Sequence, residues 1–292
     1  MFRLTHSNID ISYGEVNTDE PREPEYVDLD EYRLVVYNKK NDVLWTEKFD
    51  GNVMAGVVID IIGDKVKEVI VGIGGESEDT GKVIAFDASG KELWSYLPKM
   101  RKYYSGGSSN KLAVQTLVVE SLFNDQEKEI VVLYRDAHGW YQSRLVLLDA
   151  AGNKIGSYWH PGHLSRVVLG SEDGGYPLNI LVGGLNNDIS SQFDGTGYIY
   201  GVFLLNPTNI QGEAPPYYGQ VRRGSQEWYG LILPRGESTH RLEIIDPDND
   251  NKNEICVWTN KGHIFYLNFS GQIIGLGRSD GAVGSAQFML TN

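Results

Sequence analysis

The sequence predicts an all-β protein, and three features of its composition and patterning support that prediction. Glycine is abundant, with 34 residues in a chain of 292, and aromatic residues make up 11%. Short runs of alternating or β-branched apolar residues recur between turns rich in Gly, Asp and Asn, which is typical of strands. Long apolar patterns of helical period are absent, so we expect few or no helices.

The charge of the chain limits what it can bind. The formal net charge is −13 and the isoelectric point is near 4.9, which argues against a nucleic-acid backbone or an anionic membrane surface as the main partner. The negative net charge is more compatible with cations or basic proteins as partners. The single cysteine, Cys256, lies in an apolar run, where we expect a buried and unreactive thiol rather than redox chemistry.

The sequence also bears on location. No segment approaches the roughly 18 apolar residues of a membrane span, and the first residues lack the pattern of a secretory signal. We therefore expect a cytoplasmic protein if Met1 is the native start. We expect an extracellular one if the chain is an excised domain of a longer secreted protein.

The strand-like runs repeat as units of four. The clearest unit covers residues 54–98 and ends in a hairpin with the tight turn DASGKE. Three more units follow, over about 112–160, 164–220 and 240–277. The equivalent turn residues of the four units are Asp87, Asp149, Asn206 and Asn268. They are 57 to 62 residues apart, which matches a four-stranded propeller blade with one long loop.

A fifth unit is split between the two ends of the chain. YRLVVYNKKNDVLWTEKF has the third and fourth strands of the unit, NIDISYG can supply the second, and GSAQFML, near the C-terminus, the first. A closing blade built from 8–49 plus 282–290 would pair the termini and remove the exposed edges of an open array. The sequence thus predicts one domain over residues 1–292, a five-bladed β-propeller with one blade shared between the termini.

The acidic turn of the last complete unit carries a specific pattern. DPDNDNKNE, residues 246–254, matches D-x-D-x-D-x-x-x-E through Asp246, Asp248, Asp250 and Glu254. This pattern resembles the FG-GAP or VCBS family of propeller repeats, and strands such as GKVIAFDASGKELW are similar to quinoprotein-type repeats. The resemblance implies a propeller but says little about activity.

The spacing in this loop suits a structural calcium site. Calcium takes about six to eight oxygen ligands, and a looping chain can supply them from alternate side chains and a main-chain carbonyl. Asp246, Asp248, Asp250 and Glu254 would be side-chain ligands, with the carbonyl of Lys252 between them. Carboxylates crowded in this way repel one another without a cation, so metal binding and folding should be coupled. The alternative is a solvated turn held by side-chain to backbone hydrogen bonds.

The equivalent loops of the other units retain less of the pattern. IDIIGDKVKE keeps Asp60, Asp64 and Glu68 but has Ile62 in the middle, so it is a possible degenerate metal site. SLFNDQEKE keeps only Asp125 and Glu129, and GSEDGGYPLN keeps little beyond turn residues.

The opposite face of the propeller should carry the longer connections, which are rich in aromatic and arginine side chains. Such side chains on the loops of a rigid scaffold are typical of interface hot spots, although each can also pack over a blade end. The predicted partner-binding residues are His138, Trp140, Tyr141, Tyr217, Tyr218, Arg222, Arg223, Trp228 and Tyr229. The strand tryptophans Trp45, Trp94 and Trp159 are instead expected to pack between blades.

No catalytic motif is found. His160 and His163 lack a third zinc ligand, and there is no G-x-S-x-G elbow. The sequence therefore favours a non-catalytic recognition or scaffold propeller that binds a protein partner through its long-loop face and holds structural calcium in one blade. The alternative is a carbohydrate-binding or carbohydrate-active propeller, with Trp140, Trp228 and loop carboxylates around the channel binding a glycan.

Overall fold

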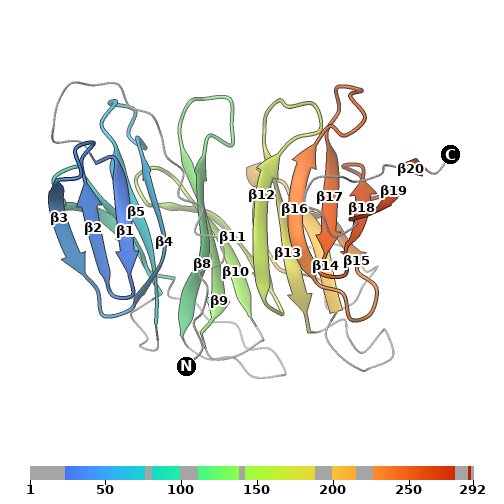
Figure 1. The fold of residues 1–292 in the computed structure, drawn as a ribbon, viewed down its shortest axis with the longest axis horizontal. Coiled ribbons are helices and arrows are strands. Elements are labelled where there is room, and N and C mark those ends of the chain that lie inside the picture. The colour runs from blue at the N-terminus through green and yellow to red at the C-terminus, as the bar shows by residue number, and fades with distance from the viewer. Residues whose placement is uncertain are drawn as a thin grey trace.

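The computed structural model describes residues 24–75, 81–98, 111–137, 142–187, 199–214, 226–279 and 289–290. Its strands form five antiparallel sheets that follow one another in chain order (Figure 1). In these ranges the helical structure is a single 3₁₀ turn, η2 (Pro207–Asn209). None of the helical structure described is long and apolar enough to cross a membrane.

The five sheets have these strands. The first sheet contains β1 (Tyr26–Asp30), β2 (Arg33–Tyr37) and β3 (Val43–Lys48). The second contains β4 (Asn52–Ile59), β5 (Glu68–Gly74), β6 (Val83–Phe86) and β7 (Glu92–Tyr96). The third contains β8 (Leu112–Glu120), β9 (Glu129–Asp136), β10 (Ser143–Leu148) and β11 (Lys154–His160). The fourth contains β12 (Leu164–Gly170), β13 (Asn179–Asn186), β14 (Ile199–Leu205) and β15 (Gln226–Ile232). The fifth contains β16 (Thr239–Ile245), β17 (Glu254–Thr259), β18 (His263–Leu267), β19 (Ile273–Arg278) and β20 (Met289–Leu290).

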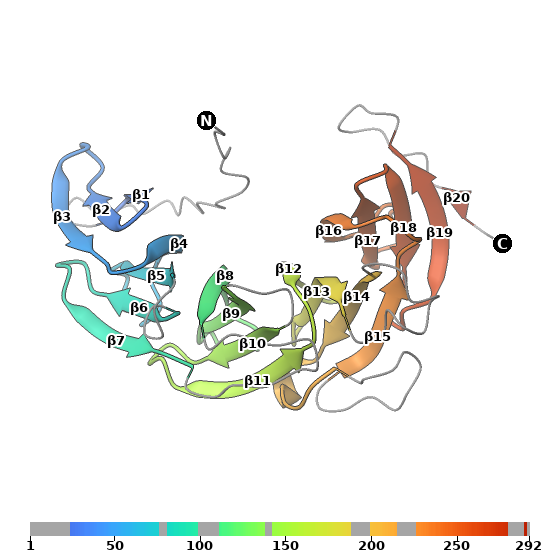
Figure 2. The same ribbon diagram turned by 90° about the horizontal axis from the view of Figure 1, so that it is seen from below.

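The sheets are arranged as the blades of a propeller. Figure 2 shows them along an arc, with β4, β8, β12 and β16 on its inner side and β7, β11, β15 and β19 on its outer side. The all-β, five-bladed propeller predicted from the repeat is confirmed. The first and fifth sheets lie at the two ends of the arc, which is open in this view (Figure 2).

The core lies between successive sheets, and this explains the apolar runs of the central strands. In β9, Val131 and Leu133 pack toward the fourth sheet, while Ile130, Val132 and Tyr134 pack toward the second. A strand with apolar neighbours on both faces has little room for alternating polar residues, so EIVVLY is a continuous apolar run. Similar cores join the first sheet to the second and the fourth to the fifth.

Two tryptophans fix the outer edges of neighbouring sheets, as predicted. The indole N–H groups of Trp45 and Trp94 each donate to a carbonyl in the hairpin of the next sheet, at 3.1 and 2.9 Å. Their rings lie against Gly90 and Gly152, both at positive φ. A Cβ at Gly90 would lie 2.8 Å from the Trp45 ring, and one at Gly152 would lie 2.5 Å from the Trp94 ring, so both sites require glycine.

Trp159 is not equivalent to these two residues. In the β10–β11 register the matching position is Gly156, where a Cβ would lie 2.3 Å from the carbonyl oxygen of Ile210. Here the outer strand pairs directly with the chain after β14, through Trp159 N donating to Gly212 O at 3.0 Å. Trp159 therefore links two blades through a backbone hydrogen bond, unlike Trp45 and Trp94, which do so through their indole rings.

The predicted shared blade differs from the pairing in the structure. The end of GSAQFML forms β20, whose Leu290 and Met289 pair with Gly275 and Leu276 of β19 in the fifth sheet. Among the described residues the first sheet has three strands, and its β1 pairs antiparallel with β2. The outer edge of β19 offers free N–H and C=O groups to a strand that follows it in the chain, which gives β20 a local partner. NIDISYG lies outside the described residues.

The fourth sheet also differs from its predicted form. We expected a hairpin at Asn206 leading directly into the last strand of that blade. Instead the Asn206 side chain accepts from Thr208 N and caps η2. The hairpins at Asp87, Asp149 and Asn268 each have a glycine at positive φ three residues later, where this turn has Asn209. The last strand is β15, so Trp228 and Tyr229 belong to a strand paired with β14 and not to a loop.

Candidate metal centre

The loop between β16 and β17 is wound around the carboxylate of Asp246. Its Oδ1 accepts from Asn249 N at 2.7 Å, and its Oδ2 accepts from Asn251 N at 2.9 Å. Both asparagines have positive φ, 62° and 67°, a conformation that asparagine tolerates better than most residues. The loop therefore turns back on itself, and its start lies close to Glu254, the first residue of β17.

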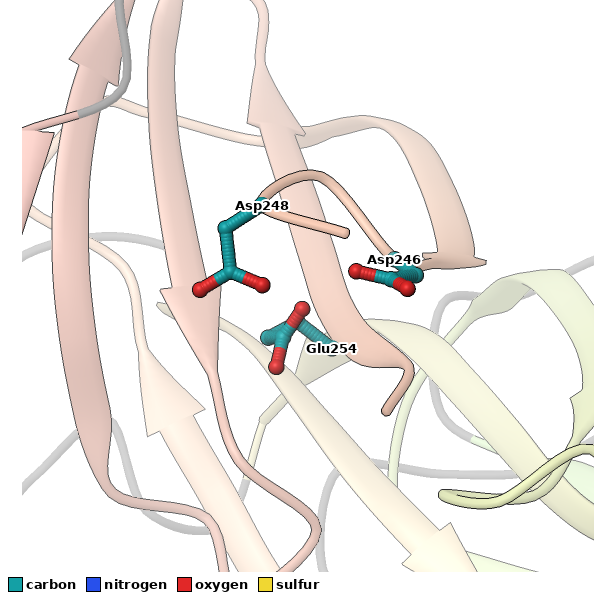
Figure 3. Close-up of side chains that lie close together, drawn as sticks. All are labelled: Asp246, Asp248 and Glu254. Carbon is teal, nitrogen blue, oxygen red and sulfur yellow. The ribbon is translucent and has the colours of Figure 1, made fainter. Parts of the chain in front are cut away.

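Three carboxylates meet in this loop. One oxygen each from Asp246, Asp248 and Glu254 can be chosen so that all lie within 4.8 Å of one another (Figure 3). Within the ranges that the structure describes, this is the one cluster of three or more acidic, histidine or cysteine side chains that close together. An all-oxygen ligand set of this kind suits a hard cation such as calcium.

Glu254 is the member of the cluster that most needs a counter-charge. Its side chain is buried, with the residue 7% exposed, and its Oε2 has no hydrogen-bond partner in the described structure. A buried carboxylate without a partner is costly, so it must bind a cation or take up a proton. The buried, unpartnered oxygen supports a cation site independently of the acidic composition of the loop.

The equivalent glutamates of two other blades show why Glu254 lacks a partner. Glu68 Oε2 accepts from Ile61 N at 2.9 Å, and Glu129 Oε2 accepts from Leu122 N at 2.8 Å. In both cases the donor lies seven residues before the glutamate, and in the fifth sheet that position is Pro247. Proline has no N–H. The bond that satisfies the other two glutamates therefore cannot form at Glu254.

Burial and crowding change the acidity of Glu254. Burial, followed by the neighbouring carboxylates of Asp248, Asp250, Asp246 and Glu172 in that order of effect, raises its pKa to about 7. Burial also raises the pKa of Glu68 and of Glu129, but their backbone hydrogen bonds oppose that rise. The charged form of Glu254 thus depends most on an added cation.

The structure does not bring together all five predicted ligands. Asp250 lies outside the group of three, and its Oδ1 accepts from Lys252 N at 2.8 Å. The Lys252 ammonium lies 3.7 Å from the carboxylate of Glu172 in the preceding blade. The Lys252 carbonyl stays a prediction.

The loop is also tied to the fourth sheet by Asn253. Its backbone N–H donates to Glu172 O at 2.6 Å, and its side-chain amide donates to Ser171 O at 2.8 Å. Both acceptors lie in the loop between β12 and β13. A cation that ordered residues 246–254 would therefore also stabilise the contact between the last two blades.

The predicted degenerate site has the same turn but lacks a carboxylate cluster. Asp60 accepts from Gly63 N and Lys65 N, as Asp246 does from its own loop, and Asp64 accepts from Val66 N. Ile62 replaces the carboxylate of Asp248, and Asp60, Asp64 and Glu68 form no group of the kind found in the fifth sheet among the described residues.

The predicted partner-binding residues divide into seven outside the described part of the chain and two in a strand. His138, Trp140, Tyr141, Tyr217, Tyr218, Arg222 and Arg223 lie outside the described residues. Trp228 and Tyr229 lie in β15, as noted above. His160, predicted not to be a zinc ligand, is buried and stacked on Phe203 with ring centres 5.3 Å apart; burial lowers its pKa to about 3.

Comparison with known proteins supports the fold. No family model matches the sequence, and no curated protein matches it. The Dos1 propeller has a TM-score of 0.50 and 9% identity over 87% of this chain and 54% of that chain. BBS1N in complex with ARL6DN has a TM-score of 0.40 and 12% identity over 87% and 77%. BamB from Moraxella catarrhalis has 0.37 and 15% over 92% and 77%. The Dos1 likeness supports a β-propeller and nothing finer, and the FG-GAP or VCBS resemblance stays a prediction.

One residue of the acidic loop, Pro247, distinguishes it from the other two loops but is not part of the motif. Pro247 stands inside the acidic motif at a position that the motif leaves free, where the other two loops have Ile61 and Leu122. Aligning the three loops on their glutamates exposes this difference. Its meaning becomes visible only when the structure shows which N–H each glutamate accepts from.

Proposed function

We propose that this chain is a non-catalytic recognition or scaffold propeller that holds a structural calcium ion in its fifth sheet. A protein partner binds on the long-loop face. The calcium ligands are the carboxylates of Asp246, Asp248 and Glu254, with Asp250 and the Lys252 carbonyl as further candidates. The ion would neutralise a buried charge and fix the β16–β17 loop, and it would perform no chemical step.

The observation that carries this proposal is the partnerless oxygen of Glu254. An acidic turn alone is common, and its Asp side chains here already serve as acceptors within the loop. A buried carboxylate that has lost its backbone donor to Pro247, and that faces two more carboxylates, is explained by a bound cation.

Calcium binding can be tested directly with two matched variants. Asp248→Asn keeps the size of the side chain and its ability to accept from Asp250 N, but removes a charge from the cluster. Asp125→Asn makes the same change in the corresponding loop of the third sheet, where the carboxylate accepts from Glu127 N. Isothermal titration of the chelator-treated protein should show one site in the parent and in Asp125→Asn, and at least about tenfold weaker binding in Asp248→Asn. Equal affinity in all three would contradict the assignment.

The partner face is tested separately. Replacing Trp140 and Tyr141, or Tyr217 and Tyr218, by alanine should reduce capture of a protein partner, while Ile155→Ser, a change at an exposed residue of β11, should leave it unchanged. Unchanged capture by both double variants would remove the long-loop face from the proposal. Binding of the parent to a glycan array, lost in Trp140→Ala, would instead favour the carbohydrate-binding alternative.

A further inference from the structure

A groove lies between the second and third sheets, away from the candidate metal centre. Its volume is about 740 Å³. Its walls come from the β4–β5 loop at 60–63, the β8–β9 loop at 125–128, the β10–β11 hairpin at 149–151, and Leu93 and Trp94 of β7. Loops of these types share one end of a propeller with the β16–β17 loop, so the groove lies on the face opposite the long loops.

The floor of this groove is apolar and exposed. Ile62 is 57% exposed and Leu93 is 39% exposed. The Trp94 indole beside them is held in place by its hydrogen bond to the hairpin carbonyl at 2.9 Å and by its contact with Gly152. A single exposed large apolar residue is ordinary, but two beside a fixed indole around one hollow indicate a contact surface.

The rim of the groove is acidic. Its charged residues are Asp60, Asp125, Glu127 and Asp149, with Lys128 as the one cation among the lining residues. The Lys128 ammonium lies 3.3 Å from the Glu120 carboxylate, so its charge is largely balanced outside the groove. The Asp60 and Asp149 carboxylates are held by hydrogen bonds with their own loops. The groove therefore presents fixed negative charge around an apolar floor.

We propose that this groove binds a segment of a protein partner in which an apolar side chain is flanked by lysine or arginine. The apolar side chain would cover Ile62 and Leu93, and the basic residues would face the carboxylates of the rim. The same position that carries Asp248 in the metal loop carries Ile62 here, so one repeat position serves ion binding in one blade and partner contact in another. The proposal is independent of the calcium site and of the long-loop face.

The test uses three short labelled peptides and fluorescence anisotropy. One alternates leucine with arginine and lysine, the second has serine in place of leucine, and the third has glutamate in place of the basic residues. The groove variant is Ile62→Ser with Leu93→Ser. The control is Ile155→Ser with Ile273→Ser, which changes residues 50% and 48% exposed that do not line the groove. Neither variant removes a buried side chain, so both should fold as the parent does.

The expected result is binding of the basic leucine peptide to the parent and to the control variant, and at least about tenfold weaker binding to the groove variant. The serine and glutamate peptides should bind at least about tenfold more weakly to the parent, and added salt should weaken the basic peptide. Three outcomes would overturn the proposal: no binding of the basic leucine peptide to the parent, equal loss in the groove and control variants, or equal binding of the glutamate peptide.

Discussion

The loop at 60–68 and the loop at 246–254 have the same local hydrogen bonding but differ in the donors available to their buried glutamate. In each, the first aspartate accepts from the N–H groups three and five residues later. In the second sheet, Ile61 N donates to Glu68 Oε2, whereas in the fifth sheet Pro247 has no N–H and Glu254 Oε2 is without a donor. The repeat thus keeps its buried glutamate in both sheets but supplies a backbone donor to it in only one of them.

A second exchange accompanies the first. Where the fifth sheet has Asp248, the second has Ile62, exposed to solvent. The 60–68 loop therefore has a backbone donor for its glutamate but no carboxylate at the third position. The 246–254 loop has the carboxylate but no donor. Two independent positions change in the direction that an ion site requires, which is hard to explain if the acidic turn were only solvated.

Calcium removal should give the largest difference between the two loops. At a calcium concentration one hundred times the Kd, a single site stabilises the fold by about 2.7 kcal/mol, and chelator should remove that stabilisation. Denaturation in urea, with calcium and then with chelator, measures it. Glu254→Gln should lose most of the calcium response.

Glu68→Gln is the matched change in the second sheet. It should lower stability by a similar amount with and without calcium, because Glu68 interacts with a backbone donor and not with an ion. A Glu68→Gln variant that lost the calcium response would show that the ion binds in the 60–68 loop and not in the 246–254 loop.

Removing the donor from the second-sheet loop should have the next largest effect. Ile61→Pro and Ile61→Ala both remove a buried side chain, but only proline also removes the N–H that Glu68 accepts from. Pro247 shows that the equivalent position accepts proline in this turn. Ile61→Pro should therefore be less stable than Ile61→Ala by about 1–3 kcal/mol in urea denaturation. Equal stability would mean that the hydrogen bond to Glu68 contributes little, and the contrast with Glu254 would lose its basis.

The calcium-free protein should also show a pH dependence centred on Glu254. Its folded-state pKa is about 7 and its ordinary value is 4.5, so the folded state binds more protons between these limits. The stability contributed by the protonated group is fully present below about pH 4.5 and is lost as the pH rises through 7. In chelator, the unfolding free energy of the parent should fall relative to Glu254→Gln by about 2–3 kcal/mol across that window. Parallel pH profiles would show that Glu254 titrates normally.

Much of this comparison could be predicted from the sequence, and the reason is the repeat. Strands apolar on both faces, such as β9, follow from packing between blades, so the propeller was predictable. β20 has two residues, too few for a pattern to specify its partner, and β15 follows a connection that begins with the 3₁₀ turn η2 in place of the expected hairpin. The acidic motif contains Asp246, Asp248 and Glu254, whose carboxylates meet in the structure, but it also contains Asp250, which lies outside that group.

The smallest predicted effect comes from a substitution that makes the 246–254 loop more like the 60–68 loop. Pro247→Ala restores an N–H at the position from which Ile61 and Leu122 donate, so Glu254 should gain the hydrogen bond of its counterparts. A hydrogen bond to a charged group contributes about 1.5–3 kcal/mol, and replacing proline costs about 0.4–1 kcal/mol through the unfolded state. The net gain should be about 1 kcal/mol in chelator, with a smaller calcium response, as measured by urea denaturation. Pro234→Ala, at an exposed proline before β16, controls for the loss of proline alone and should give no gain. If Pro247→Ala behaves like this control, the missing N–H is not what leaves Glu254 in need of an ion.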